Sequence, residues 1–134
     1  MIVSMHVATG AAAGALAGSR LGALALGPLL HVACDVVPHQ DIASRKFEIA
    51  TGVAGVLALA AVHGPFAPAT IGAVAASAPD LEHVLHLPRP GGRKLFPSHR
   101  FGWHRAGGLP AWAQVLAAGA ILGAVLASPS RRKD

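Results

Sequence analysis

Histidines and carboxylates are concentrated in one short stretch of an otherwise apolar, alanine-rich chain. Residues 31–41 contain two of each: His31, Asp35, His39 and Asp41. His31 and Asp35 are four residues apart, so on a helix they lie on the same face. Pro38 ends that helix, because the residue before a proline is driven out of the α region. Neutral imidazole and carboxylate are the ligands that zinc and related divalent metals take. The stretch therefore predicts part of a metal site.

The composition indicates one domain of a helical membrane protein. The chain has 134 residues, 53% of them hydrophobic and 13% charged, where a soluble domain has about 25% charged residues. Abundant alanine and glycine are typical of closely packed membrane helices. The basic residues lie between the apolar runs, as in membrane proteins, whereas a nucleic-acid-binding protein would carry them along a helix with aromatics between. We therefore expect no nucleic-acid partner. The single cysteine, Cys34, excludes an internal disulfide framework.

Apolar runs separated by short polar or proline-containing segments predict an all-α fold. The runs cover residues 7–19, 22–37, 47–62, 69–79 and 109–128. We expect an integral membrane bundle of about five helices, with an irregular loop over residues 87–105 before the last helix. The run at 109–128 is the best transmembrane candidate, because about twenty apolar residues cross a bilayer core. The helical membrane domain is predicted to cover residues 1–129 and to be followed by a disordered polar tail, 130–134.

The path of the chain brings the chemistry-bearing residues together. Short turns make neighbouring helices antiparallel, so alternate helix ends lie at the same end of the bundle. Tracing the helices in this way places His63 at the opposite end. It gathers nine residues at one end: His6, His31, Asp35, His39, Asp41, Asp80, His83, His99 and His104. Ionisable groups inside a membrane are costly and mark functional sites.

Each residue taken alone also has a plain structural interpretation. His6 could be a helix cap, His31 and Asp35 a hydrogen-bonded pair, and Arg100 a lipid-headgroup contact. Convergence of the whole set favours a site for one or two divalent ions, with Zn²⁺ expected. The predicted ligands are His6, His31, Asp35, His39, Asp80, His83, His99 and His104. Either Asp41 or Glu82 could act as general base, and Arg100 could bind a phosphoryl oxygen.

Four short motifs resemble the inner-membrane metal-dependent hydrolase family, also described as LexA-binding, inner-membrane-associated hydrolases. Pro79-Asp80-Leu81-Glu82-His83 resembles that family's Pro-Asp-x-Asp-His motif, and His99-Arg100-Phe101-Gly102-Trp103-His104 is similar to its His-Arg-Gly-x-Thr-His motif. His31-Val32-Ala33-Cys34-Asp35 resembles its His-x-x-x-Asp element, and His6 matches its N-terminal histidine. Two features differ: His31–Asp35 precedes the Pro-Asp motif here, and Phe101 and Trp103 stand where the family has Gly and Thr.

The resemblance implies a bacterial inner-membrane protein with a divalent-metal site and hydrolase activity, distantly similar to zinc-dependent phospholipases C. The expected substrate is a phosphoester, which could be a lipid, at the bilayer surface. A non-catalytic metal-binding scaffold or a metal-ion carrier is the alternative, although carriers hold their ligands near the bilayer centre rather than at helix ends. Seven of the eleven basic residues fall at the metal end, which predicts that this end faces the cytoplasm.

Overall fold

The computed structural model describes residues 1–85, 87–103 and 105–129, and its fold is all-α, as predicted. The long helices are α1 (Val3–Ala17), α2 (Arg20–Val36), α3 (Arg45–His63), α4 (Pro68–Ser77) and α7 (Ala111–Ala127). The shorter elements are the 3₁₀ turns η1 (Ala78–Asp80) and η2 (Pro90–Gly92) and the helical turns α5 (Leu81–Val84) and α6 (Pro97–Arg100). The predicted irregular loop thus contains two short helical turns. The predicted tail, 130–134, lies outside the described residues.

Local sequence signals set the helix ends. The Ser19 hydroxyl accepts a hydrogen bond from the Gly22 amide, so α2 begins at Arg20, two residues earlier than expected. The helix ends at Val36, and Val37 is extended before Pro38, as predicted. The Ser44 hydroxyl caps α3 in the same way as Ser19 caps α2.

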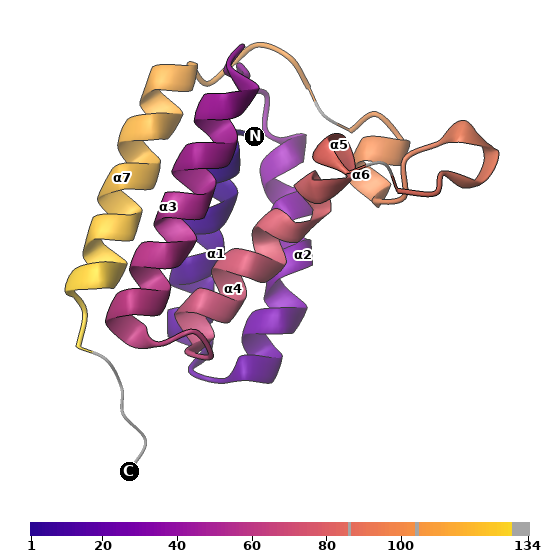
Figure 1. Ribbon diagram of the computed structural model, residues 1–134. Helices are drawn as coiled ribbons and strands as arrows, with labels where there is room; N and C mark the ends of the chain where they lie inside the picture. The colour runs from indigo at the N-terminus through magenta and orange to yellow at the C-terminus, as the bar shows by residue number, and fades with distance from the viewer. Residues whose placement is uncertain (86, 104, 130–134) are drawn as a thin grey trace.

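Helix α4 packs against both α1 and α2, while α3 and α7 cover another side of α1 (Figure 1). The chain runs from α3 into α4 through a turn at the end of the bundle opposite to α5 and α6. This arrangement leaves the start of α1, the end of α2 and the end of α4 at one end of the bundle, as the antiparallel trace predicted.

Glycines allow α1 and α4 to approach each other at backbone distance. A Cβ atom added to Gly10 would collide with the Gly72 carbonyl and the Ala76 side chain, and one added to Gly72 would collide with the Gly10 carbonyl. His6 lies one helical turn before Gly10, and Asp80 lies four residues after Ala76. The close contact therefore brings Asp80 towards His6.

The core of the bundle is small, and many large apolar side chains face outward. The buried cluster consists of Val7, Ala11, Leu59, Ala69, Ala73 and Val125. Exposed large apolar side chains occur on every long helix: Leu16 on α1, Leu24 and Leu29 on α2, Val53 and Leu57 on α3, Val74 on α4, and Trp112 and Leu116 on α7.

Of the helices in the described ranges, α3 is long and apolar enough to cross a membrane, with 17% of its 18-residue window buried. The sequence predicts residues 109–128 as the best candidate, and that prediction is wrong. Pro110 precedes the helix, and α7 covers only Ala111–Ala127, 17 residues. Helix α1 is also apolar but shorter.

The segment after α2 is fixed by pairing with the segment before α7. The His39 amide donates to the Arg105 carbonyl at 3.1 Å, and the Leu109 amide donates to the Pro38 carbonyl at 2.9 Å. Gly108 has a φ of 68°, and a Cβ atom there would collide with Pro38. The buried Gln114 side chain donates to the Gln40 carbonyl at 2.7 Å. The loop between α2 and α3 is thereby held at the same end of the bundle as the start of α7.

We predict that Gly10→Ala destabilises the fold by about 1–3 kcal/mol, because the added methyl group overpacks the contact between α1 and α4. Gly119→Ala is the matched control, since a Cβ atom there has open space, and it should be neutral or stabilising by roughly 0.5–1 kcal/mol. Thermal unfolding of the purified variants measures the difference. Equal melting temperatures for the two variants would contradict the close α1–α4 contact.

Candidate metal centre

Six of the predicted ligands meet at the end of the bundle where α1 starts and α2 ends. They form three overlapping groups whose nitrogen and oxygen atoms lie within 4.8 Å of one another. The groups are His6 with His31 and Asp80, His31 with Asp35 and His99, and Asp80 with His83 and His99. As predicted, α1, α2, the end of α4 and the later loop bring these six residues together.

Asp35 lies at the centre of the cluster and is 1% exposed. Its Oδ1 atom is 3.3 Å from His6 Nε2 and 2.9 Å from the Met1 nitrogen. Its Oδ2 atom is 3.1 Å from His31 Nε2 and accepts a hydrogen bond of 2.7 Å from the Ser98 hydroxyl. Both carboxylate oxygens are therefore held in place by groups from several parts of the chain.

The hydrogen bonds of His31 and His99 determine which ring nitrogen carries the proton. His31 Nδ1 lies 2.7 Å from the Ala76 carbonyl, which can only accept, so Nδ1 is the protonated nitrogen. His99 Nδ1 lies 2.5 Å from the Glu82 carboxylate and donates to it. The two Nε2 atoms then face each other at 3.1 Å. His31 Nε2 then carries a lone pair, and His99 Nε2 carries one whenever the His99 ring is neutral, with the Asp35 carboxylate beside both atoms. Such a group of electron-rich atoms attracts a cation.

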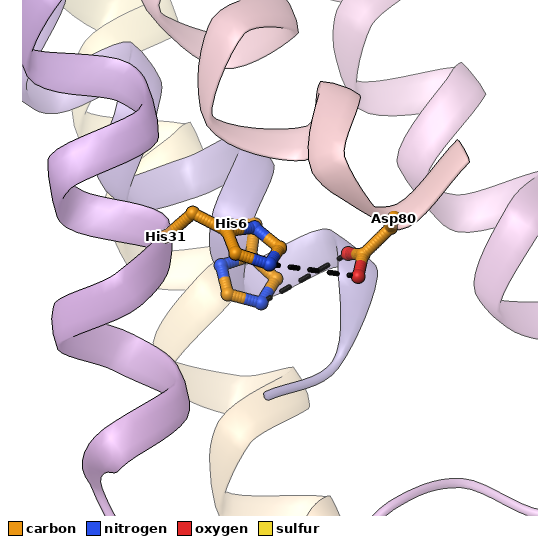
Figure 2. A group of neighbouring side chains, drawn as sticks. All are labelled: His6, His31 and Asp80. Carbon is orange, nitrogen blue, oxygen red and sulfur yellow. Dashed lines mark ion pairs between the residues drawn. The ribbon is translucent and has the colours of Figure 1, made fainter. Parts of the chain in front are cut away.

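His6 and Asp80 supply further donor atoms at this point (Figure 2). His6 Nε2 is 3.9 Å from Asp80 Oδ2, and His31 Nε2 is 3.7 Å from Asp80 Oδ1. The His6 and His31 rings are stacked, with centroids 3.9 Å apart. Within the described ranges, both His6 ring nitrogens and Asp80 Oδ2 are buried and have no hydrogen-bond partner. Buried polar atoms normally find partners, so these atoms point to a ligand.

Glu82, which we predicted as a candidate general base, holds His99 instead. One carboxylate oxygen accepts from His99 Nδ1, and the other accepts from the Leu95 amide at 2.6 Å. Burial alone would raise the pKa of Glu82, but these two hydrogen bonds lower it overall. A carboxylate that accepts a proton from the remote nitrogen of a metal-binding histidine orients the ring and increases its basicity. The geometry thus favours a positioning role for Glu82.

Burial and neighbouring charges shift the pKa values of the other groups at the end of α4 and in the following loop. Burial raises the pKa of Asp80. Burial, together with the charges of His99 and Lys94, lowers the pKa of His83 to about 4, which keeps this ring neutral at pH 7. Burial alone would lower the pKa of His99, but its hydrogen bonds with Asp35 and Glu82 raise it overall.

The remaining predicted site residues lie elsewhere or face other partners. His39 is buried, with Nδ1 2.6 Å from the Val37 carbonyl and Nε2 3.3 Å from Asp41, and it belongs to none of the three groups. Arg100 is exposed, with its guanidinium 5.9 Å from the Phe101 ring centroid, and does not line the cavity described below. His104 lies outside the described residues.

Ser98 is a member of the site that the sequence did not reveal. It is fully buried and donates to Asp35, 63 residues earlier in the chain. Serine is common in loops, so its type gave no signal. Its position directly before His99 is the only feature of the sequence that could have indicated it.

A cavity of about 720 Å³ opens beside the cluster. Three of the candidate ligands line it: Asp80, His83 and His99. Asp41 also lines it, with 60% of its side chain exposed, as do the basic residues Arg45 and Lys94. The basic side chains at the cavity are therefore Arg45 and Lys94, whereas the predicted Arg100 does not line it.

The donor set suits a divalent cation. Four imidazoles and two carboxylates are the ligand types of zinc and of related first-row metals. Their number exceeds the four of a single tetrahedral zinc site, so one or two ions would fit. Glu82 behind His99, and the Ala76 carbonyl behind His31, provide the outer hydrogen bonds that ligating histidines require.

Comparisons of the chain with protein-family models, with curated proteins and with solved structures found no match. The resemblance of the motifs at His6, His31, Asp80 and His99 to the membrane hydrolase family therefore stays a prediction. The geometry of the cluster supports the proposals below.

We predict that Glu82→Gln lowers metal affinity about 10- to 100-fold, because the neutral amide orients and polarises His99 less well than the carboxylate. Titration of the metal-free protein with Zn²⁺ in competition with a coloured chelator measures this. Glu48→Gln is the matched control, since Glu48 lines the cavity but belongs to none of the three groups. An unchanged affinity in Glu82→Gln would show that His99 does not bind the metal.

Proposed function

We propose that this protein is a divalent-metal-dependent hydrolase that acts on phosphoesters at a membrane surface. The observation that carries the proposal is the convergence of His31 Nε2, His99 Nε2 and the Asp35 carboxylate, beside the unpartnered donor atoms of His6 and Asp80. A bound divalent ion would polarise a phosphoryl oxygen and lower the pKa of water to about 7. Hydrolysis is the reaction that these two effects promote.

The surrounding residues can perform the other tasks of phosphoester hydrolysis. Asp41, which lines the cavity and is largely exposed, is the candidate base that takes the proton from the attacking water. The water oxygen forms a bond to phosphorus, the bond from phosphorus to the alcohol oxygen breaks, and the leaving oxygen takes up a proton. Lys94 and Arg45 lie at the cavity and replace Arg100 as the candidate contacts to phosphoryl oxygens.

The proposal includes a membrane location. It is supported by the apolar outer surface of the long helices and by the length and hydropathy of α3. The cluster lies at the ends of helices, so it would stand near the bilayer surface rather than at its centre. In this proposal the membrane is a bacterial inner membrane, and the metal end faces the cytoplasm because most basic residues lie at that end.

A membrane-embedded bundle should resist extraction. After expression, we expect the protein to stay in the membrane pellet through washing with alkaline carbonate and to be released by detergent, because its apolar surface is solvated by lipid. A soluble helical protein would appear in the supernatant before any detergent is added. That result would refute the membrane location. It would not bear on the metal site, which elemental analysis tests.

Loss of a central ligand should remove the metal. We predict that purified wild-type protein holds one or two equivalents of divalent metal by elemental analysis, and that His31→Ala and Asp80→Ala lower this content severalfold. His63→Gln is the matched control, because His63 is the last residue of α3, which ends away from α5 and α6 (Figure 1), and it contacts the Val125 carbonyl. Near-zero metal in the wild type, after incubation with Zn²⁺ or Mn²⁺, would overturn the proposal.

Catalysis is tested separately with soluble and lipid phosphoesters. Wild-type protein loaded with metal should release phosphate or alcohol from at least one of them, and Asp80→Ala and chelator-treated protein should not. Activity that survives both treatments would exclude the metal mechanism. Metal content without any turnover would favour the alternative, a non-catalytic metal-binding scaffold.

A further inference from the structure

The cavity beside the metal centre continues as an apolar groove between helices. From the cluster it extends along α3, where Ile49, Gly52, Val53 and Val56 line it. Its other walls come from Val3 and Val7 on α1 and from Val74 on α4. Its volume of about 720 Å³ lies within the roughly 300–1,000 Å³ range of small-molecule sites.

The two ends of this groove differ in chemistry. One end holds the candidate ligands Asp80, His83 and His99, together with Lys94 and Arg45. The other end, formed by α1, α3 and α4, is lined by valines, isoleucine and glycine. Two carboxylates, Asp41 and Glu48, also line the groove. A ligand that fills the whole groove must therefore be polar at one end and apolar at the other.

The groove is open at its side. Val53 and Val74, which line it from α3 and α4, are 52% and 47% exposed. Helices α3 and α4 diverge from each other in the direction of α5 and α6 (Figure 1). Neighbouring apolar residues on the outer face of α3 are exposed as well, Leu57 among them. A chain lying in the surrounding bilayer can thus reach the groove laterally without passing through water.

We propose that the substrate is a membrane lipid phosphoester whose acyl chain lies in the groove between α3 and α4 while its phosphate group reaches the metal centre. This inference rests on the proposed function, and it adds the class of substrate and the direction of entry. Lys94 Nζ, which is 3.1 Å from His83 Nδ1, lies at the metal end of the groove and supplies a positive charge for the phosphate. Val53 and Val74 select for a long chain because they line the apolar end.

Photolabelling of the full-length protein in detergent tests the groove. The probe is a phosphatidic acid that carries a diazirine at the end of one acyl chain. We expect labelling at α3 and α4, around Val53 and Val74. Val53→Trp fills the groove and should reduce this labelling about tenfold, which corresponds to ~1.4 kcal/mol. Leu57→Trp is the matched control, because it lies on the same helix outside the groove lining, and its labelling should equal that of wild type.

Two further comparisons make the result decisive. A diacylglycerol with the same diazirine chain lacks the phosphate and should label the groove about tenfold less. Val74→Trp fills the groove from α4, and should repeat the effect of Val53→Trp if that variant unfolds. Equal labelling of Val53→Trp and Leu57→Trp, or equal labelling of α2, α3 and α7 in the wild type, would overturn the inference.

Failure of the inference can be told apart from failure of the proposed function. Hydrolysis of a soluble phosphoester with no groove labelling would leave the hydrolase and remove the lipid substrate. Groove labelling with no hydrolysis of any phosphoester would leave a lipid-binding metal site and remove the hydrolase. If both proposals are right, Val53→Trp loses turnover of long-chain lipid phosphoesters, whereas Leu57→Trp retains it.

Discussion

The burial of the Asp35 carboxylate is the constraint on which the rest of the structure depends. A carboxylate that is 1% exposed in an alanine-rich bundle is costly unless compensating groups surround it. His6 from α1, His31 from α2, and Ser98 and His99 from α6 all contact it. Those contacts hold the start of α1 and the loop after α5 against the end of α2. Among the described residues neither ring nitrogen of His6 has a hydrogen-bond partner, so hydrogen bonds alone leave the compensation incomplete, and a cation would complete it.

The position of Asp80 depends on a different kind of contact, the packing of small residues. Gly10 and Gly72 let α1 and α4 touch through their backbones, and Gly27 on α2 meets Ala75 on α4 in a similar way. The small residues lie one or two helical turns away from His6, His31 and Asp80, so their contacts fix the separation of the three functional side chains. Side chains in such an interface cannot be enlarged without moving the site. The alanine and glycine content is therefore part of the metal centre's geometry as well as of the fold.

Much of this arrangement could be predicted, because it follows from helix period and chain direction. The four-residue spacing of His31 and Asp35 and the antiparallel path were sufficient to bring His6, Asp35, Asp80 and His99 to one end. The rest depends on loop conformations, which spacing does not determine. The Leu95 amide fixes one Glu82 oxygen while the other accepts from His99. The pairing of residues 38–40 with 105–109 gives His39 other partners. For the same reason Lys94, rather than Arg100, reaches the cavity. The sequence predicts the longest apolar helix at residues 109–128, but Pro110 precedes α7, which is therefore shorter than α3.

The tight core also explains where a substrate can lie. Glycine contacts bring α1, α2 and α4 together at backbone distance around Gly10, Gly27 and Gly72. Helix α3 approaches α1 closely at Gly52 and Gly55 but diverges from α4 near the metal centre (Figure 1). Along α3 beyond Glu48, the cavity is lined by Ile49, Gly52, Val53 and Val56, and water is a poor solvent for such a surface. A groove that is apolar, open at the side and joined to a charged centre matches an amphiphile better than a fully polar phosphoester. The helix packing that forms the candidate metal centre therefore also supports the proposal of a lipid substrate.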